Sequence, residues 1–218
     1  MRTADELVPP PGWSRRSLAE LCLSISTGPT QRAEDKGRTR ADGGTPLVLP
    51  RDLRGRRIVT VEDAAAVPVI PWDRARTLAK YELAEGDVLL TRTGTVGRCA
   101  LVTGEHVGWL FHPNLVRLRL PEAGPVGAAY LAAYLSATAA QEWIRDRTSG
   151  SVIPSLSIRT LGELPVLLPP AAEQAAIGAT LAALDDKIQA HNEIARATRA
   201  YRGVLADALM NGVLSAEP

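Results

Sequence analysis

Residues 171–211, AAEQAAIGATLAALDDKIQAHNEIARATRAYRGVLADALMN, decide the fold and follow directly after Pro169-Pro170. Proline cannot continue a strand but is well tolerated where a helix begins, and Glu173 lies where a negative charge suits the helix dipole. The segment therefore predicts one long amphipathic helix. At a rise of ~1.5 Å per residue this helix would extend for ~60 Å, about twice the width of a small domain. We expect its apolar stripe to pack against another helix.

The apolar residues of this helix have a regular spacing in its first half and two possible continuations in its second half. Its first part has the 4-3-4 spacing of a coiled-coil seam. The stripe then continues through His191 and Ala195 or, after a three-residue slip, through residues that include Thr198. Polar seam residues can fix register and orientation. The alternative is a long helix packed along its own domain. The predicted helix–helix interface consists of Ile177, Leu181, Leu184, Ile188, Ile194, Tyr201, Leu205 and Leu209.

The residues before this helix predict a globular α+β domain. Short apolar runs bounded by Gly, Asp and Pro indicate strands, and the Ala-rich segment 126–147 predicts two short helices with a break near Ser136 and Thr138. Ser14 or Ser17 is expected to cap a short helix near the start of the domain. The predicted strands cover residues 47–49, 58–61, 87–91, 98–102 and 114–120.

Alternation in the last of these runs places Arg117 and Arg119 on one face, which we expect to be solvated. The whole chain divides into a flexible lead-in at 1–12, the globular domain at 13–168, the long helix at 169–212 and a tail at 213–218.

Charge is distributed unevenly along the chain. Residues 31–57 contain eight Lys or Arg against four acids, and because the whole chain carries +1, the remainder carries −3. Much of this basic segment falls in residues 27–46, which lack apolar periodicity and predict a long surface loop, a common place for function. A binding patch and a solvated loop both fit these charges. Aromatic residues make up only 4% of the chain, which argues against an extensive base-stacking platform.

Patterns that carry catalysis are missing from the sequence. The turn Thr91–Gly97 lacks the Gly-Lys-Ser/Thr ending of a phosphate loop and precedes a strand, and the three histidines have no metal-ligand spacing. Cys22 and Cys99 lie alone in apolar runs and indicate buried thiols in a reducing compartment. The N-terminus has no signal-peptide pattern, and no apolar run approaches about 18 residues. We therefore expect a cytoplasmic non-enzyme without a metal or bound cofactor.

Four stretches occur in an order that resembles a known family. They are GDVLLTRTGTVG at 86–97, TSGSVIPSLS at 148–157, LPVLLPP at 164–170, and EQAAI at 173–177 continuing into LDDKI at 184–188. Together they resemble the specificity (S) subunit of type I restriction–modification systems, over nearly the whole chain from Trp13 to about Gly212. The usual family member has two target recognition domains and two long helices. This sequence contains one of each and no internal repeat, so it resembles a half-subunit.

The resemblance implies that DNA recognition and methyl transfer belong to different subunits. In the family each recognition domain reads half of a bipartite DNA sequence, and the helices pack antiparallel as a coiled coil. The helices also dock the modification subunits, whose adenine methyltransferase chemistry uses S-adenosylmethionine. The implied partners are double-stranded DNA, the modification subunit, a second copy of this chain and, in some assemblies, a restriction motor subunit, with no role for a membrane. Two copies joined by their helices would read an inverted repeat whose halves lie less than ~18 base pairs apart.

The DNA contacts expected from this resemblance divide into phosphate and base contacts. Any single arginine could instead pair with Asp52, Asp73 or Glu82. Two other functions also fit the sequence: a specificity module of another DNA-targeting defence complex, and a coiled-coil adaptor that binds protein rather than DNA. For phosphates we predict Arg54, Arg56, Arg57, Arg74, Lys80, Ser149 and Ser151. For base edges we predict Gln31, Arg32, Lys36, Arg38, Arg40, Arg92 and Thr95.

Overall fold

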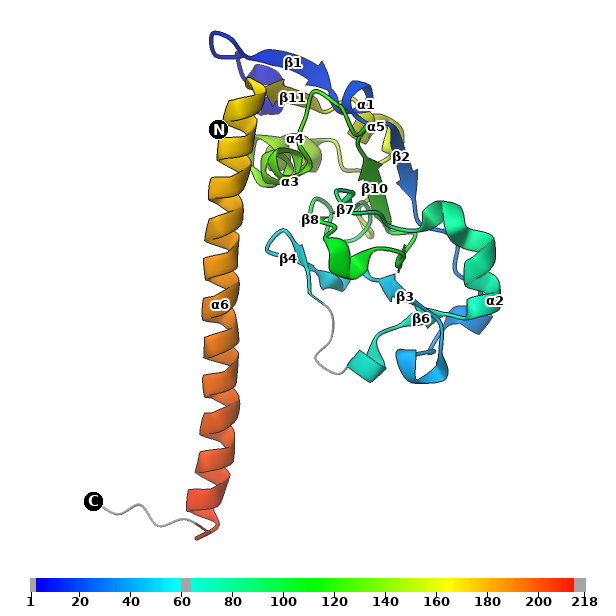
Figure 1. The fold of residues 1–218 in the computed structure, drawn as a ribbon, viewed down its shortest axis with the longest axis vertical. Coiled ribbons are helices and arrows are strands. Elements are labelled where there is room, and N and C mark those ends of the chain that lie inside the picture. The colour runs from blue at the N-terminus through cyan, green and yellow to red at the C-terminus, as the bar shows by residue number, and fades with distance from the viewer. Residues whose placement is uncertain (1–2, 60–63, 214–218) are drawn as a thin grey trace, which may run out of the picture. The chain divides into compact units, whose positions relative to one another are not determined.

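The computed structural model describes residues 3–59 and 64–213, and the chain divides into two compact units between Ala179 and Thr180 (Figure 1). We call the first unit, residues 3–179, the head. Its sheets and short helices form an α+β domain. The long helix α6 (Ala171–Met210) begins in the head and makes up most of the second unit. Among the described residues, no helix combines the length and the apolar character needed to cross a membrane.

The centre of the head is a four-stranded antiparallel sheet in the order β2-β10-β7-β8. Alternate residues of β7 and β10 face opposite cores. Val88 and Val116 face a core built with the helices α3 and α4, whereas Leu89 and Leu115 face a second core that contains Phe111. The sheet is therefore buried on both faces. Its strands are β2 (Ser24–Thr27), β7 (Val88–Thr91), β8 (Cys99–Leu101) and β10 (Leu115–Arg119), and the helices are α3 (Ala128–Ser136) and α4 (Thr138–Asp146).

Because both faces of the central sheet are covered, one prediction from the sequence is wrong. Arg117 was expected on a solvated face, yet it is only 5% exposed. Its guanidinium donates to the carbonyls of Lys80 (3.3 Å) and Glu82 (2.9 Å) and lies 5.6 Å from the ring of Phe111. Burial lowers the pKa of Arg117 from its usual value. Arg119 is half-buried and pairs with Asp87 at 2.6 Å. Both guanidinium groups are thus bound by other groups of the domain.

A smaller mixed sheet, in the order β6-β3-β9, lies beside the second core. β3 runs antiparallel to β6 and parallel to β9. Leu47, Ile70, Ala75 and Leu110 form a compact cluster in this part of the head. Of the predicted strand at 58–61, Ile58 lies in β5, and residues 60–61 lie outside the described residues. The elements here are β3 (Thr45–Val48), β4 (Leu53–Arg54), β5 (Arg57–Ile58), β6 (Val69–Ile70), α2 (Trp72–Ala75) and β9 (Leu110–Phe111).

The beginning of the chain pairs with the segment that precedes α6. β1 (Ser14–Ser17) and β11 (Pro165–Leu168) form a two-stranded antiparallel sheet, and α1 (Leu18–Leu21) packs beside α5 (Ile158–Gly162). Ser17 is the N-cap residue of α1, as predicted, and its backbone N–H donates to the Glu20 carboxylate at 2.7 Å. The expected lead-in contributes Ala4 to the core, and at the surface Asp5 pairs with Arg147.

The start of α6 belongs to the head. Gln174 and Gly178 are buried, and Ile177 packs against the core built with α3. A Cβ at Gly178 would lie 3.3 Å from the Ala129 Cβ and from the Tyr130 backbone nitrogen, so this position favours the smallest residue. The predicted helix at 171–211 is confirmed, with its last helical residue at Met210.

Candidate nucleic-acid interface

Two turns that are distant in the sequence form one surface, which we call the paired turns (residues 92–97 and 149–155). The N–H of Gly94 donates to the carbonyl of Pro154 at 2.9 Å, and the N–H of Leu156 donates to the carbonyl of Arg92 at 2.8 Å. Ser149 and Ser155 exchange backbone hydrogen bonds within the second turn. The structure thereby brings together four predicted contact residues: Arg92, Thr95, Ser149 and Ser151.

The paired turns present hydroxyl groups on a fixed backbone. Thr95, Ser149 and Ser151 are exposed, whereas Arg92 is half-buried and its Nε lies 3.2 Å from the Leu156 carbonyl. Gly150 has a φ of +103°, and a Cβ there would lie 2.4 Å from the Ile153 carbonyl oxygen, so a side chain is excluded. Exposed hydroxyls and backbone N–H groups are common phosphate ligands.

The predicted long loop connects β2 to β3 and contains two 3-10 turns, Ala33–Asp35 and Arg40–Asp42. It is tied to the segment before β6, because the N–H of Arg40 donates to Val67 (2.8 Å) and the N–H of Val69 donates to Arg38 (3.3 Å). The loop backbone is thus held in place while its cations face solvent. The predicted contact residues Arg32, Lys36, Arg38 and Arg40 are exposed, and Gln31 is half-buried.

Three predicted arginines lie on the hairpin β4–β5. Its turn uses Gly55 and Arg56, both with positive φ. Arg54 is exposed and its Nε donates to the Arg51 carbonyl at 2.9 Å, while Arg56 and Arg57 are half-buried. The Arg56 carbonyl accepts a hydrogen bond from Leu101 in β8. The hairpin is therefore attached to the edge of the central sheet.

The two remaining predicted cations have different surroundings. Lys80 is exposed and lies 5.1 Å from the ring of Tyr81. The Arg74 side chain is only 13% exposed, and its Nε lies 3.0 Å from Asp35 Oδ2. Asp35 is a buried acid inside the basic loop that sequence reasoning overlooked as a partner. The position of Asp35 among basic residues of the loop was the sequence feature that could have indicated an ion pair.

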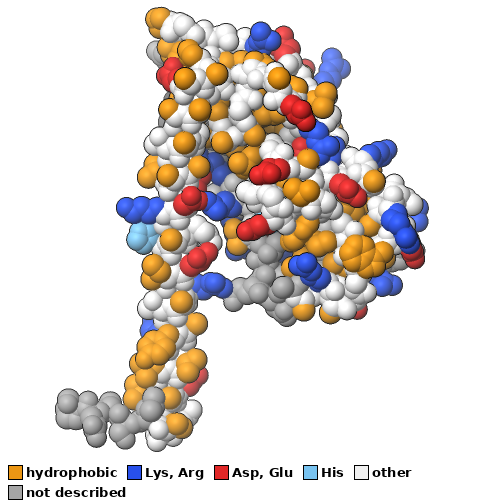
Figure 2. Space-filling view, viewed as in Figure 1, with side chains coloured by type: hydrophobic (Ala, Val, Ile, Leu, Met, Phe, Trp, Pro, Cys, Tyr) orange, Lys and Arg blue, Asp and Glu red, His pale blue; other side chains and the backbone are white. Residues whose placement is uncertain are grey.

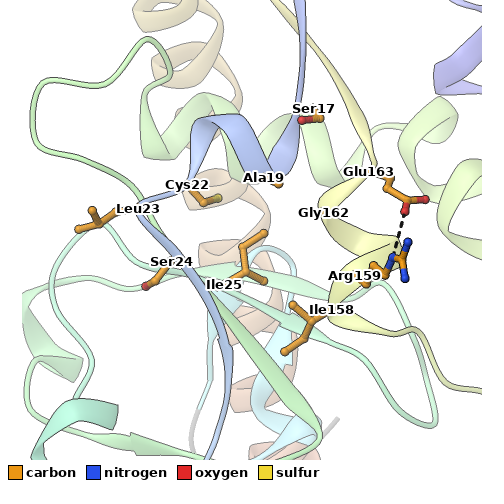
Figure 3. Close-up of a pocket in the computed structure, with 10 residues that line it drawn as sticks. All are labelled: Ser17, Ala19, Cys22, Leu23, Ser24, Ile25, Ile158, Arg159, Gly162 and Glu163. Carbon is orange, nitrogen blue, oxygen red and sulfur yellow. Dashed lines mark ion pairs between the residues drawn. The ribbon is translucent and has the colours of Figure 1, made fainter.

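An open groove of about 510 Å³ lies elsewhere on the head, between α1, β2 and α5 (Figure 3). Its lining is mostly apolar, and the side chains of Arg159 and Glu163 form an ion pair (3.9 Å) beside it. Burial raises the pKa of the Cys22 thiol to about 12, so this thiol stays protonated and is a poor nucleophile. Of the two predicted buried thiols, Cys99 is buried and Cys22 is half-buried. Within the described ranges, no group of three or more His, Cys, Asp or Glu is arranged to hold a metal ion.

The second unit carries an apolar stripe on α6. Hydrophobic side chains are visible along this helix in Figure 2. Leu184, Ile188, Ile194 and Tyr201 are 51%, 57%, 62% and 68% exposed. Leu181, Leu205 and Leu209 are half-buried. Such a row of large exposed apolar residues is typical of a helix surface that packs against a partner.

Comparison with known proteins identifies the family. The model of the type I restriction modification DNA specificity domain matches residues 10–197. The chain therefore belongs to this family. The comparison with curated proteins gave no match.

Solved structures of type I restriction–modification proteins share the fold. The S subunit from M. genitalium superimposes with a TM-score of 0.63 at 17% identity, over 96% of this chain and 48% of its own. The HsdS subunit from Thermoanaerobacter tengcongensis gives 0.57 at 17% identity, over 94% and 50%. A chain from a structural study of the assembly and conformational transition of the type I R-M system gives 0.63 at 19% identity, over 94% and 46%. The chain thus spans about half the length of these structures.

Proposed function

We propose that this chain supplies DNA sequence recognition to a type I restriction–modification complex, with its head reading one half of a bipartite target. The observation that carries the proposal is the family match, which extends over residues 10–197 and so includes most of the head and the first part of α6. The paired turns and the long loop support it. They present polar and basic side chains from backbones that are already hydrogen-bonded.

The head's DNA contacts would then divide by chemistry. Exposed cations and hydroxyls suit phosphate oxygens, whereas Arg and Gln suit the base edges of the major groove. The phosphate contacts are Arg54, Arg56, Arg57, Lys80, Ser149 and Ser151. The base contacts are Gln31, Arg32, Lys36, Arg38, Arg40, Arg92 and Thr95.

A second copy of the chain would supply the other half-site. The stripe on α6 from Leu181 to Leu209 leaves large apolar side chains exposed, and packing against an identical stripe in an antiparallel coiled coil would bury them. Ile177 already packs against the head's core, so the proposed seam begins after it. Two identical heads would read an inverted repeat.

Catalysis would belong to other subunits. The chain would bind no cofactor, and the modification subunit would transfer the methyl group of S-adenosylmethionine to adenine in the DNA. The paired α6 helices would dock this subunit. A restriction motor subunit would join in those assemblies that cleave DNA.

Selection from a random DNA library tests this function. The complex of the chain with its modification subunit should enrich one sequence, and its affinity for that sequence should fall steeply with salt. Arg38→Ala and Arg92→Ala should weaken enrichment, whereas Arg159→Ala, beside the apolar groove, should not. No enrichment, with salt-independent or absent DNA binding, would favour a protein-interaction adaptor.

A further inference from the structure

Arg74 connects the long loop to α2. Its Nη2 donates to the Thr30 carbonyl at 2.7 Å, and its Nε lies 3.0 Å from Asp35 Oδ2. The same Asp35 oxygen accepts the backbone N–H of Arg32 at 2.7 Å. One guanidinium therefore joins residues at both ends of the segment 30–35.

Burial raises the energetic cost of breaking this ion pair. The Asp35 side chain is fully buried, and Arg74 is 13% exposed. Asp35 Oδ1 and Arg74 Nε are both buried without a hydrogen bond in the part of the chain that the structure describes, so the contact between Arg74 Nε and Asp35 Oδ2 is an ion pair. Removing Arg74 would leave a buried carboxylate without this cation, which is unfavourable in an apolar setting.

The helix that carries Arg74 is packed into the head. Arg74 lies on α2 next to Ala75, which is 6% exposed and packs with Leu47, Ile70 and Leu110. A second attachment, the backbone hydrogen bonds of Arg38 and Arg40 to residues 67–69, holds the far side of the loop. Exposed Lys36 lies between the two attachments.

We propose that Arg74 is a positioning residue that fixes the base-reading loop before DNA arrives, instead of a phosphate contact. The assignment rests on the proposed function, because it supposes that Lys36, Arg38 and Arg40 read bases. A preformed loop loses less conformational entropy when it binds. Arg74 then contributes to the ratio of specific to non-specific affinity, with little effect on general attraction to DNA.

The two roles differ in their salt dependence. A phosphate contact strengthens binding to every duplex, and its loss reduces the salt slope by about 1. A positioning residue leaves the slope unchanged. Its loss should lower the specific-to-non-specific ratio by roughly tenfold, comparable to one mismatched base pair.

The test uses the full chain in complex with its modification subunit. The probes are a duplex carrying the sequence that the wild type selects from a random library and a scrambled duplex of equal length. Arg74→Ala and Asp35→Asn should lower the affinity ratio at unchanged salt slope, and Arg74→Lys should fall between them and the wild type. Arg76→Ala is the matched control, since Arg76 pairs with Asp73 at the surface with both side chains exposed.

A second readout needs no DNA. Trypsin should cleave after Lys36 and Arg38 faster in Arg74→Ala than in the wild type or Arg76→Ala, at a temperature where all are folded. Equal cleavage, an unchanged affinity ratio, or an equal loss on both duplexes with a shallower slope would overturn the assignment. If the wild type selects no sequence, the proposed function fails, and the specificity role of Arg74 fails with it. If Arg74→Ala reads the selected sequence as well as the wild type does, only the role of Arg74 fails.

Discussion

The side-chain oxygen of Gln174 accepts a hydrogen bond from the backbone N–H of Gly127 at 3.1 Å, which joins the first turn of α6 to the start of α3. The Gln174 amide nitrogen also donates to the carbonyls of Pro125 (2.8 Å) and Pro169 (2.9 Å). One buried amide thus satisfies three backbone groups around the beginning of the long helix.

Gln174→Ala should destabilise the head. The substitution leaves buried backbone groups without partners, and we expect the free energy of unfolding to fall by about 2 kcal/mol. Glu173→Ala, at an exposed neighbouring position, should change it by less than about 0.5 kcal/mol. Urea unfolding of both variants measures the difference. Equal stabilities would show that Gln174 does not secure α6.

Arg117→Ala should reduce stability without changing the salt dependence of DNA binding. The variant loses the hydrogen bonds to the Lys80 and Glu82 carbonyls in a buried site, so we expect a loss of about 3 kcal/mol. Arg145→Ala, at an exposed position of α4, is the control. A shallower salt slope at full stability would instead make Arg117 a phosphate contact.

The sequence predicted those helices and strands that are indicated by neighbouring residues alone. Strands β7, β8 and β10, the helix break near Ser136 and the start of α6 follow from apolar runs, short polar residues and Pro169-Pro170. β2 was not predicted, because its SIST sequence has a single large apolar residue. The burial of Arg117 was not predicted either, since alternation shows that a face is shared but not what covers it.

The sequence predicted which residues belong to the candidate site but not which of them lie close together. A backbone hydrogen bond from the N–H of Gly94 to the carbonyl of Pro154 joins the two paired turns, and no local sequence pattern indicates such a long-range pairing. The same limit applies to Arg74, whose partner Asp35 is distant in the sequence.

Ile188→Asp should dissociate the proposed dimer. A carboxylate placed in an apolar seam is left without a partner, and we expect the dissociation free energy to fall by about 3 kcal/mol, or more than 100-fold in affinity. Ala183→Asp, at another exposed position of the same helix, should leave the mass unchanged. Sedimentation equilibrium measures both. A wild-type monomer that stays monomeric with its modification subunit present would contradict self-pairing.

Stability should decrease as pH falls below about 6.5, the usual histidine pKa. Burial lowers the pKa of both His106 and His112, and His112 Nδ1 accepts the N–H of Asn114 at 3.0 Å, which requires an unprotonated nitrogen. In that window the unfolded chain binds more protons than the folded one, so the folded state loses stability until its own lower pKa is reached.

Melting temperatures between about pH 7.5 and about pH 5.5 test this linkage. The decrease should be smaller in His112→Gln, whose amide oxygen can accept the same N–H, and unchanged in His191→Gln, at an exposed position of α6. An identical decrease in all three proteins would assign the pH dependence to other groups.

The most direct test of the central claim is a map of methylated adenines in DNA from cells that express this chain with its modification subunit as the only specificity source. Two identical heads joined through α6 predict one motif made of two identical half-sites in inverted repeat, separated by a fixed number of unspecified base pairs. Ile188→Asp should abolish that methylation. A motif with two different half-sites, or a single half-site methylated alone, would contradict the account.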